Sequence, residues 1–199
     1  MSGDSAPINL TNHFLIAMPG LEDDIFSKSV VYVCEHGPRG AMGLVINKPA
    51  DIGLIALFDK VELPLSRPDL ADGIVFHGGP VQRDRGFVLH EPIFSQSDKP
   101  EQSLYASTLT IPGGLEMTTS RDVLEALSGG SGPRKVLVSL GYSAWAEGQL
   151  ESELGENAWL TVDADQSIIF DTPVAQRYDK ALQLLGLQAW MLSTQAGHA

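Results

Sequence analysis

Glycine and proline interrupt this chain so often that few segments are long enough for the helices of a bundle. The 199 residues include 20 glycines and 12 prolines, and the short stretches between them are rich in β-branched residues. Such runs, bounded by turn residues, are typical of β-strands. His13–Pro19 therefore predicts a buried strand, and Ser29–Glu35 and Met42–Asn47 predict two strands joined as a hairpin.

Other segments carry the spacing or the capping residues of helices. Apolar positions predict helices over Leu21–Ser27, over Asp51–Val61 with Asp51 as the N-cap, and over Trp145–Leu154. The remaining expected elements are a strand pair of Ile74–His77 with Gly86–His90, a loop over Pro92–Gln102, a helix over Arg121–Leu127, and a hairpin of Ala158–Val162 with Ser167–Phe170.

This order of elements predicts the fold class. About nine strands and four or five helices, without strict alternation, indicate an α+β domain rather than a doubly wound sheet. No long polar linker and no internal repeat divides the chain. We expect one domain over residues 1–199, with a core at about 12–187 and loose tails at 1–8 and 193–199.

The net charge argues against nucleic-acid binding. The chain has 25 acidic and 13 basic residues, a formal net charge of −12, whereas nonspecific binding to nucleic acids depends on positive charge that neutralises phosphates. Cys34 is the only cysteine, which excludes an internal disulfide and a cysteine-rich zinc site. No signal-peptide pattern or membrane-spanning run is present. We expect a cytoplasmic protein with no membrane partner, no cofactor and no metal.

The densest group of polar residues closes the first strand of the expected hairpin. Cys34 and His36 are two apart and are predicted to share one strand face, with Glu35 on the other. Cys34 could act with His36 as a nucleophile or metal ligand, but the end of an apolar strand favours a small buried side chain. Glu35 and His36 could bind a ligand, although locking the next turn is favoured. Lys48, next to Asn47 at the end of the second strand, could be a functional ammonium group or a solvated one.

Two further motifs end strands. The amides of Gly78 and Gly79 could form an anion-binding nest. A structural turn is favoured because the P-loop and dinucleotide motifs are incomplete, while Arg83 and Arg85 nearby keep an anion site open. His90 is followed by Glu91, which repeats the pairing of Glu35 with His36. If the two strand ends met, they could form a metal site or a general acid–base pair.

The last motif covers residues 141–153. On a helix that begins near Trp145, the side chains of Trp145, Gln149 and Glu153 would lie on one face. This face could hold a polar ligand or a partner protein, but anchoring through the packing of Trp145 is favoured. Glu151 and Glu153 are two apart and would diverge on a helix, which argues against the paired acids of a glycosidase.

Together these motifs resemble the YqgE/AlgH family. The resemblance is carried by residues 12–49, 76–90 and 140–154, by NAWL at 157–160 and by IIFDTP at 168–173. It implies a bacterial α+β domain with a mixed-sheet or partial-barrel core and no established catalytic activity. The residues that match the family motifs and are candidates for binding a ligand or partner are Glu35, His36, Asn47, Lys48, Gly78, Gly79, His90, Trp145, Gln149 and Glu151.

Three functions remain open from the sequence. The favoured one is a non-enzymatic binding or regulatory protein that contacts a protein or a small ligand. The alternative is an enzyme whose site assembles from Glu35, His36, Lys48 and His90. The third is a transcriptional regulator, a designation the family carries through one member linked to alginate biosynthesis. Direct DNA binding is opposed by the acidic charge and by the lack of a recognisable helix-turn-helix motif. The sequence does not set the oligomeric state.

Overall fold

The computed structural model describes residues 7–93 and 104–192 and shows a single α+β domain with a curled mixed sheet. The expected fold class is therefore confirmed. The strands are β1 His13–Ala17, β2 Val30–Gly37, β3 Gly40–Val45, β4 Pro49–Gly53, β5 Ile74–His77, β6 Val81–His90, β7 Thr108–Thr110, β8 Glu116–Thr118, β9 Val136–Ala146 and β10 Trp159–Asp163. The α-helices are α1 Leu54–Lys60, α2 Arg121–Ser128, α3 Gln149–Gly155, α4 Gln166–Phe170 and α5 Arg177–Gln183. Short 3-10 helices are η1 Pro68–Leu70, η2 Val174–Gln176 and η3 Ala189–Leu192.

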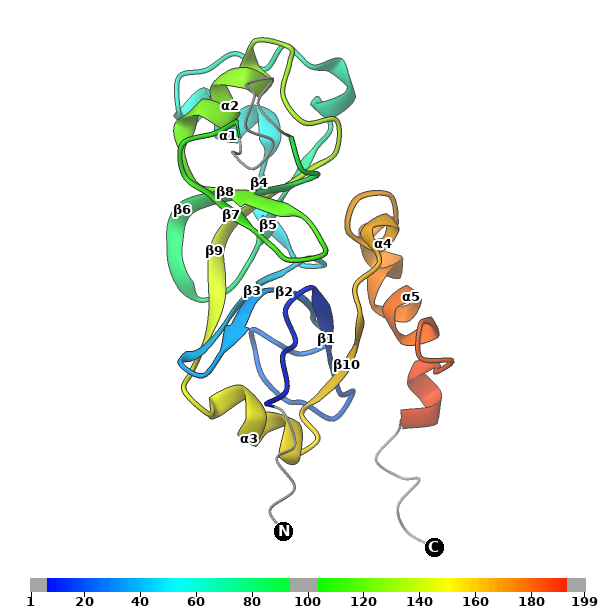
Figure 1. Cartoon of the computed structure of the whole chain (residues 1–199). Helices are drawn as coiled ribbons and strands as arrows, with labels where there is room; N and C mark the ends of the chain where they lie inside the picture. Colours follow the sequence, from blue (N-terminus) through cyan, green and yellow to red (C-terminus); the bar gives the residue numbers. More distant parts are fainter. Residues whose placement is uncertain (1–6, 94–103, 193–199) are drawn as a thin grey trace, which may run out of the picture.

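The long strand β9 connects the two parts of the sheet. The strand order is β10-β1-β2-β3-β9-β6-β8-β7, with β5 also paired to β9 and β4 paired to β5. The β5–β9 pair is parallel and the other pairs are antiparallel. Figure 1 shows α1 and α2 at one end of the molecule, α3 at the other, and α4 and α5 beside β10. No helix in the described ranges is long and apolar enough to cross a membrane.

Strand β2 is buried on both faces, which explains why its sequence is continuously apolar rather than alternating. Val30, Tyr32 and Cys34 belong to one hydrophobic cluster, together with residues of α4 and α5. Val31 and Val33 belong to a second cluster that contains both Trp145 and Trp159. The expected hairpin of β2 with β3 is confirmed, with Gly37 opposite Gly40.

A β-bulge at Cys34 corrects the prediction that Cys34 and His36 share a face. Val33 pairs with Gly43 and Glu35 pairs with Met42, so Cys34 has no opposite residue. The extra residue shifts the alternation of the strand. His36 consequently lies opposite Ala41, a residue of the second cluster, while Cys34 packs in the first.

Three expected helices differ from the structure. Leu21–Ser27 is not a helix: residues 24–28 form turns, because the carboxylate of Asp23 accepts the backbone N–H groups of Ile25 and Phe26. Asp51 lies within β4, and α1 begins at Leu54. Trp145 lies on β9, and α3 begins only at Gln149, so these two residues do not share a helix face. The prediction was wrong because Gly148, at φ 74°, separates the two elements.

Two expected strand pairings are also wrong. Residues 166–170 form α4 rather than a strand, because Asp165 accepts the backbone N–H of Ser167 as an N-cap. Strand β10 pairs with β1 instead. Strands β5 and β6 do not pair with each other, since both pair with β9. The predicted helix at 121–127 is confirmed as α2. Most of the expected loop over Pro92–Gln102 and of the two tails lies outside the described residues.

Candidate ligand-binding site

The candidate residues are distributed over several places in the structure. Glu35 and Trp145 line a cavity of about 400 Å³ at the β2–β3 hairpin. His36 and Glu151 line another, of about 460 Å³, beside Pro7–Asn9. Lys48 and Gly79 line a third, of about 230 Å³. The alternative enzyme site consists of Glu35, His36, Lys48 and His90, and none of these cavities in the described part of the chain is lined by more than one of the four.

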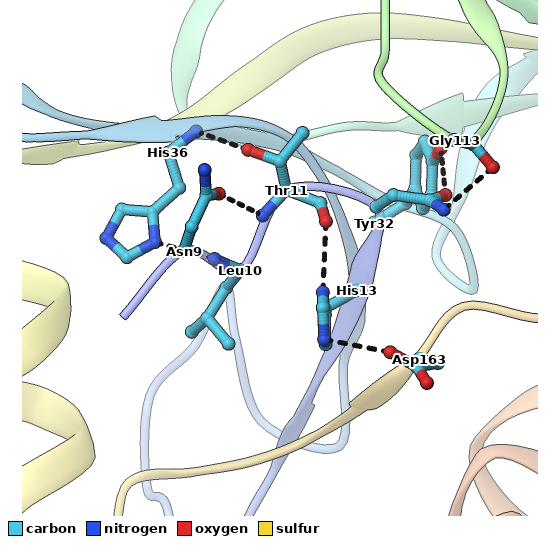
Figure 2. Close-up of polar contacts among 9 residues, drawn as sticks. Asn9, Leu10, Thr11, His13, Tyr32, His36, Gly113 and Asp163 are labelled. Carbon is cyan, nitrogen blue, oxygen red and sulfur yellow. Dashed lines mark hydrogen bonds and ion pairs between the residues drawn. The ribbon is translucent and has the colours of Figure 1, made fainter. Parts of the chain in front are cut away.

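His36 holds the N-terminal segment and α3 against β2. Its Nδ1 accepts the backbone N–H of Leu10 at 2.9 Å, and its backbone N–H donates to Oγ1 of Thr11 at 3.1 Å (Figure 2). Since Nδ1 accepts, the ring proton lies on Nε2, which donates to Oε1 of Glu151 at 2.6 Å. This hydrogen bond is the main cause of the lowered pKa of Glu151. Both polar atoms of the ring are thus used within the chain.

The same N-terminal segment is also fixed on its other side, as Figure 2 shows. Asn12 accepts the hydroxyl proton of Tyr32 at 2.8 Å and donates to the carbonyl of Gly113 at 3.1 Å. His13 lies 2.9 Å from a carboxylate oxygen of Asp163. Residues 9–13 therefore have a structural role, joining β2, β10 and the turn before β8.

Cys34 and His90 are both buried. Burial raises the pKa of the Cys34 thiol to about 12, so the thiolate of a nucleophile or metal ligand is not populated at neutral pH. Nδ1 of His90 lies 2.8 Å from the carbonyl oxygen of Glu91 and therefore carries the proton. Its Nε2 accepts from the hydroxyl of Thr118 at 2.8 Å. Burial lowers the pKa of His90, which keeps the ring neutral.

Trp145 packs in an aromatic group with Phe26 and Trp159, whose ring centroids are 5.6–6.1 Å apart. Burial raises the pKa of the adjacent Glu153 carboxyl, and the indole groups of Trp145 and Trp159 oppose this shift. Oε1 of Gln149 accepts the backbone N–H of Ala146 at 3.0 Å. Trp145 and Gln149 therefore hold the connection from β9 to α3.

Asn47 and the glycine pair position the strands around Lys48. The Asn47 amide accepts from the backbone of Val30 at 2.9 Å and donates to the carbonyl of Lys28 at 2.8 Å, so both of its ends are occupied. A Cβ atom at Gly78 or Gly79 would lie less than 3.0 Å from residues of β9. The N–H of Gly78 donates to Leu140 at 3.0 Å, which leaves this amide unavailable to an anion.

Lys48 lies at the centre of the best-supported site. We call the cavity formed with its neighbours the Lys48 pocket; it is lined by Asp24, Ile25, Lys48, Pro49, His77, Gly79 and Arg83. Pro49 pairs with Phe76 in the antiparallel β4–β5 ladder, and the N–H of His77 donates to the carbonyl of Lys48 at 2.8 Å. Lys48 and His77 are thus opposite each other, and their side chains leave the ladder on one face.

Arg83 reaches this pocket from an irregular part of β6. Val81 pairs with Tyr142 and Gly86 with Leu140, so residues 82–85 bulge outward opposite Gly141. Gln82, immediately before Arg83, has a positive φ of 47°. Bulges and such backbone strain occur preferentially at functional sites, where they redirect a side chain.

The nitrogen-bearing side chains of the Lys48 pocket are available to a ligand. Within residues 7–93 and 104–192, no hydrogen bond or ion pair engages the side chain of Lys48, His77 or Arg83. Burial lowers the pKa of Lys48, and the negative charge of Asp23 opposes this shift. Lys48 and Arg83 against Asp24 give the lining a net charge of about +1 when His77 is neutral. A local positive charge of this kind stands out in a chain of net charge −12.

The sequence predicts only part of this site. Lys48 and Gly79 are among the candidate residues, and Arg83 lies close to the glycines in the sequence. The partnership of Lys48 with His77 depends on the β4–β5 ladder, which carries no local motif. No group of three or more His, Cys, Asp or Glu side chains is placed to hold a metal ion within the described ranges.

Comparison with known proteins agrees with this fold. The AlgH-like family model matches residues 14–190. The chain belongs to the AlgH-like family. Two UPF0301 proteins, from Variovorax paradoxus and Polaromonas sp., are each 73% identical to this AlgH-like chain over 199 residues and cover all of both chains.

Two solved structures share the architecture of this AlgH-like protein. The solution structure of the AlgH protein from Pseudomonas aeruginosa is 46% identical, with a TM-score of 0.74 and coverage of 98% of each chain. A crystal structure from Corynebacterium diphtheriae is 18% identical, with a TM-score of 0.69 and coverage of 94% of this chain and 93% of the other. The second likeness concerns the fold alone.

Proposed function

We propose that this AlgH-like protein is a non-enzymatic binding protein that holds a small anionic molecule in the Lys48 pocket. The observation that carries the proposal is the group of three side chains, Lys48, His77 and Arg83, that line one cavity and have no hydrogen-bond or ion-pair partner among the described residues. Cationic and N–H donor groups that converge on a cavity are suited to bind carboxylate or phosphate oxygens. The buried lone Cys34 is in keeping with a cytoplasmic location.

Other functions have weaker support from the geometry. None of the cavities described above is lined by more than one of the four side chains of the enzyme alternative, and the ring nitrogens of His36 and His90 are already engaged within the chain. A regulatory role would operate through the bound anion or a protein contact rather than through DNA, since the charge of −12 opposes phosphate binding.

The proposal is tested by titrating ¹⁵N-labelled protein with sodium acetate or inorganic phosphate, against sodium chloride at equal ionic strength. We expect saturable shifts at the amides of residues 77–83 and around Lys48, and we expect them to be lost in Arg83→Gln. Arg134→Gln is the matched control, because Arg134 is exposed and lines none of the pockets described above. If neither anion shifts these amides, or if Arg83→Gln binds as the wild type does, the proposal is wrong.

A further inference from the structure

A second cavity adjoins the Lys48 pocket. We call it the Tyr178 pocket; its volume is about 870 Å³, and it is lined by Ser27, Lys28, Asn47, Lys48, Pro49, Val174, Ala175, Tyr178, Asp179 and Ala189. The two cavities share Lys48 and Pro49. The side chain of Lys48 therefore borders both cavities.

The inner wall of the Tyr178 pocket is mainly apolar. Pro49, Val174, Ala175, Ala189 and the ring of Tyr178 provide this surface. Two polar groups of this wall are already engaged, since the Tyr178 hydroxyl donates to the carbonyl of Ala17 at 2.6 Å and the Asn47 amide is occupied at both ends. The side chains of Ser27, Lys28 and Asp179 supply further polar groups of the lining. A hydrocarbon body against the apolar part of the wall would cover few polar groups that need a partner.

The wall is held in a fixed position relative to Lys48. Arg177, next to Tyr178 on α5, is buried and donates from Nη1 to the carbonyl of Ile46 at 2.6 Å and from Nε to the carbonyl of Thr172 at 2.9 Å. Its guanidinium also lies 5.0 Å from the centre of the Phe76 ring. Because Ile46 is two residues before Lys48, these contacts connect the wall of one pocket to the centre of the other.

The charges of the two cavities favour a single negative charge on the ligand. Among the lining residues, Lys28, Lys48 and Arg83 face Asp24 and Asp179, a net charge of about +1 with His77 counted as neutral. A carboxylate matches this value, whereas a phosphomonoester carries about −1.5 to −2 at neutral pH. The negative charge of Asp23 also acts on Lys48 and further disfavours a ligand with two negative charges.

We infer that the ligand is an amphipathic monocarboxylate, with its carboxylate between Lys48 and Arg83 and its apolar body in the Tyr178 pocket. This inference rests on the proposed function. It predicts that affinity rises with apolar length, because each added methylene removes more apolar surface from water.

The test compares acetate, hexanoate, 3-phenylpropanoate and phenyl phosphate by calorimetry and ¹⁵N titration. We expect hexanoate and 3-phenylpropanoate to bind at least about tenfold more tightly than acetate, corresponding to about two buried methylenes. Ala175→Trp, which fills the Tyr178 pocket, should reduce this ratio to nearly one and leave acetate binding unchanged. Gln176→Trp is the matched control, since Gln176 is exposed, adjacent and not part of the lining.

Each outcome separates the two proposals. If acetate binding depends on Arg83 but the longer acids bind no more tightly, or Ala175→Trp changes nothing, the inference is wrong and the proposed function stands. Tighter binding of phenyl phosphate than of 3-phenylpropanoate would also overturn the carboxylate assignment. Failure of all four probes would remove the proposed function itself.

Discussion

The backbone N–H of Leu10 donates to Nδ1 of His36 at 2.9 Å, and this contact determines which ring nitrogen of His36 carries the proton. His90 has the opposite arrangement, because its Nδ1 faces the carbonyl oxygen of Glu91 at 2.8 Å. Two buried histidines of one small domain thus adopt different neutral tautomers, each determined by a backbone group.

Long-range ¹H–¹⁵N NMR spectra at neutral pH test this assignment. We expect His36 to show the Nε2–H tautomer and His90 the Nδ1–H tautomer, because a carbonyl can only accept and a backbone N–H can only donate. The same tautomer at both positions would contradict the hydrogen-bond networks described for one of them.

Replacing His36 by leucine should destabilise the protein. The buried N–H of Leu10 would lose its acceptor, and an unsatisfied buried donor costs about 1–3 kcal/mol. Urea unfolding at pH 7 measures this loss. Glu151→Gln is the control: it keeps an acceptor for Nε2–H, and Glu151 is exposed, so its effect at pH 7 should be smaller. If both variants lost the same free energy of unfolding, the loss would come from the contact with Glu151 and not from the N–H of Leu10.

Glu116 should make the protein less stable at neutral pH than a neutral side chain would. It is 1% exposed, its Oε2 has no hydrogen-bond partner among the described residues, and burial raises its pKa above the ordinary value of 4.5. The pKa of this carboxyl is higher in the folded than in the unfolded protein, where it is about 4.5. The folded protein therefore gains stability as the pH falls from above the folded pKa to 4.5. Glu116→Gln should therefore raise Tm at pH 7, and the gain should diminish below pH 4.5. A lower Tm at pH 7 would show that the carboxylate has a stabilising partner.

Arg177 should contribute strongly to stability, although no ion pair engages it within the described ranges. Burial lowers its pKa to about 10, so the guanidinium remains charged at neutral pH. Arg177→Met removes the donors for Ile46 and Thr172 and should cost about 2–4 kcal/mol in denaturant unfolding. Arg177→Lys should rescue little, since an ammonium group does not reproduce the fork of donors. Full rescue by lysine would show that charge alone is needed.

Two glycine substitutions should have opposite consequences. Gly78→Ala would bring a Cβ within 3.0 Å of Ser139 and Gly141, so we expect a loss of more than about 2 kcal/mol. Gly155→Ala is the matched control, because Gly155 lies at the end of α3 with no atom within 4 Å of the added Cβ. This second change should be neutral or slightly stabilising. Comparable unfolding curves for the two variants would contradict the close approach of β5 to β9.

The sequence predicted those parts of the fold that depend on local patterns. The run from Val30 to Cys34 identified a buried strand, and the Gly and Pro residues after it identified the hairpin. The bulge at Cys34 could not be predicted, because it depends on the pairing with β3. The apolar spacing on both sides of Gly148 predicts a helix that includes Trp145, but the positive φ of Gly148 separates β9 from α3.

The candidate site was predictable only in pieces. Lys48 ends a recognisable hairpin and Arg83 follows a recognisable glycine pair, but nothing local shows that they line one cavity. Their meeting depends on the parallel pairing of β5 with β9 and on the bulge in β6. Long-range pairings of this kind are determined by the packing of the whole domain and not by any single segment.

Strand β9 joins the two parts of the sheet, because β3 pairs with its carboxyl-terminal part while β5 and β6 pair with its amino-terminal part. The Lys48 pocket is lined from both parts, with Lys48 after β3 and with His77 and Arg83 from β5 and β6. A molecule bound in the pocket would restrain the two parts of the sheet relative to each other. Amide hydrogen exchange would then slow on both sides of β9, so binding would change the rigidity of the protein and not its shape.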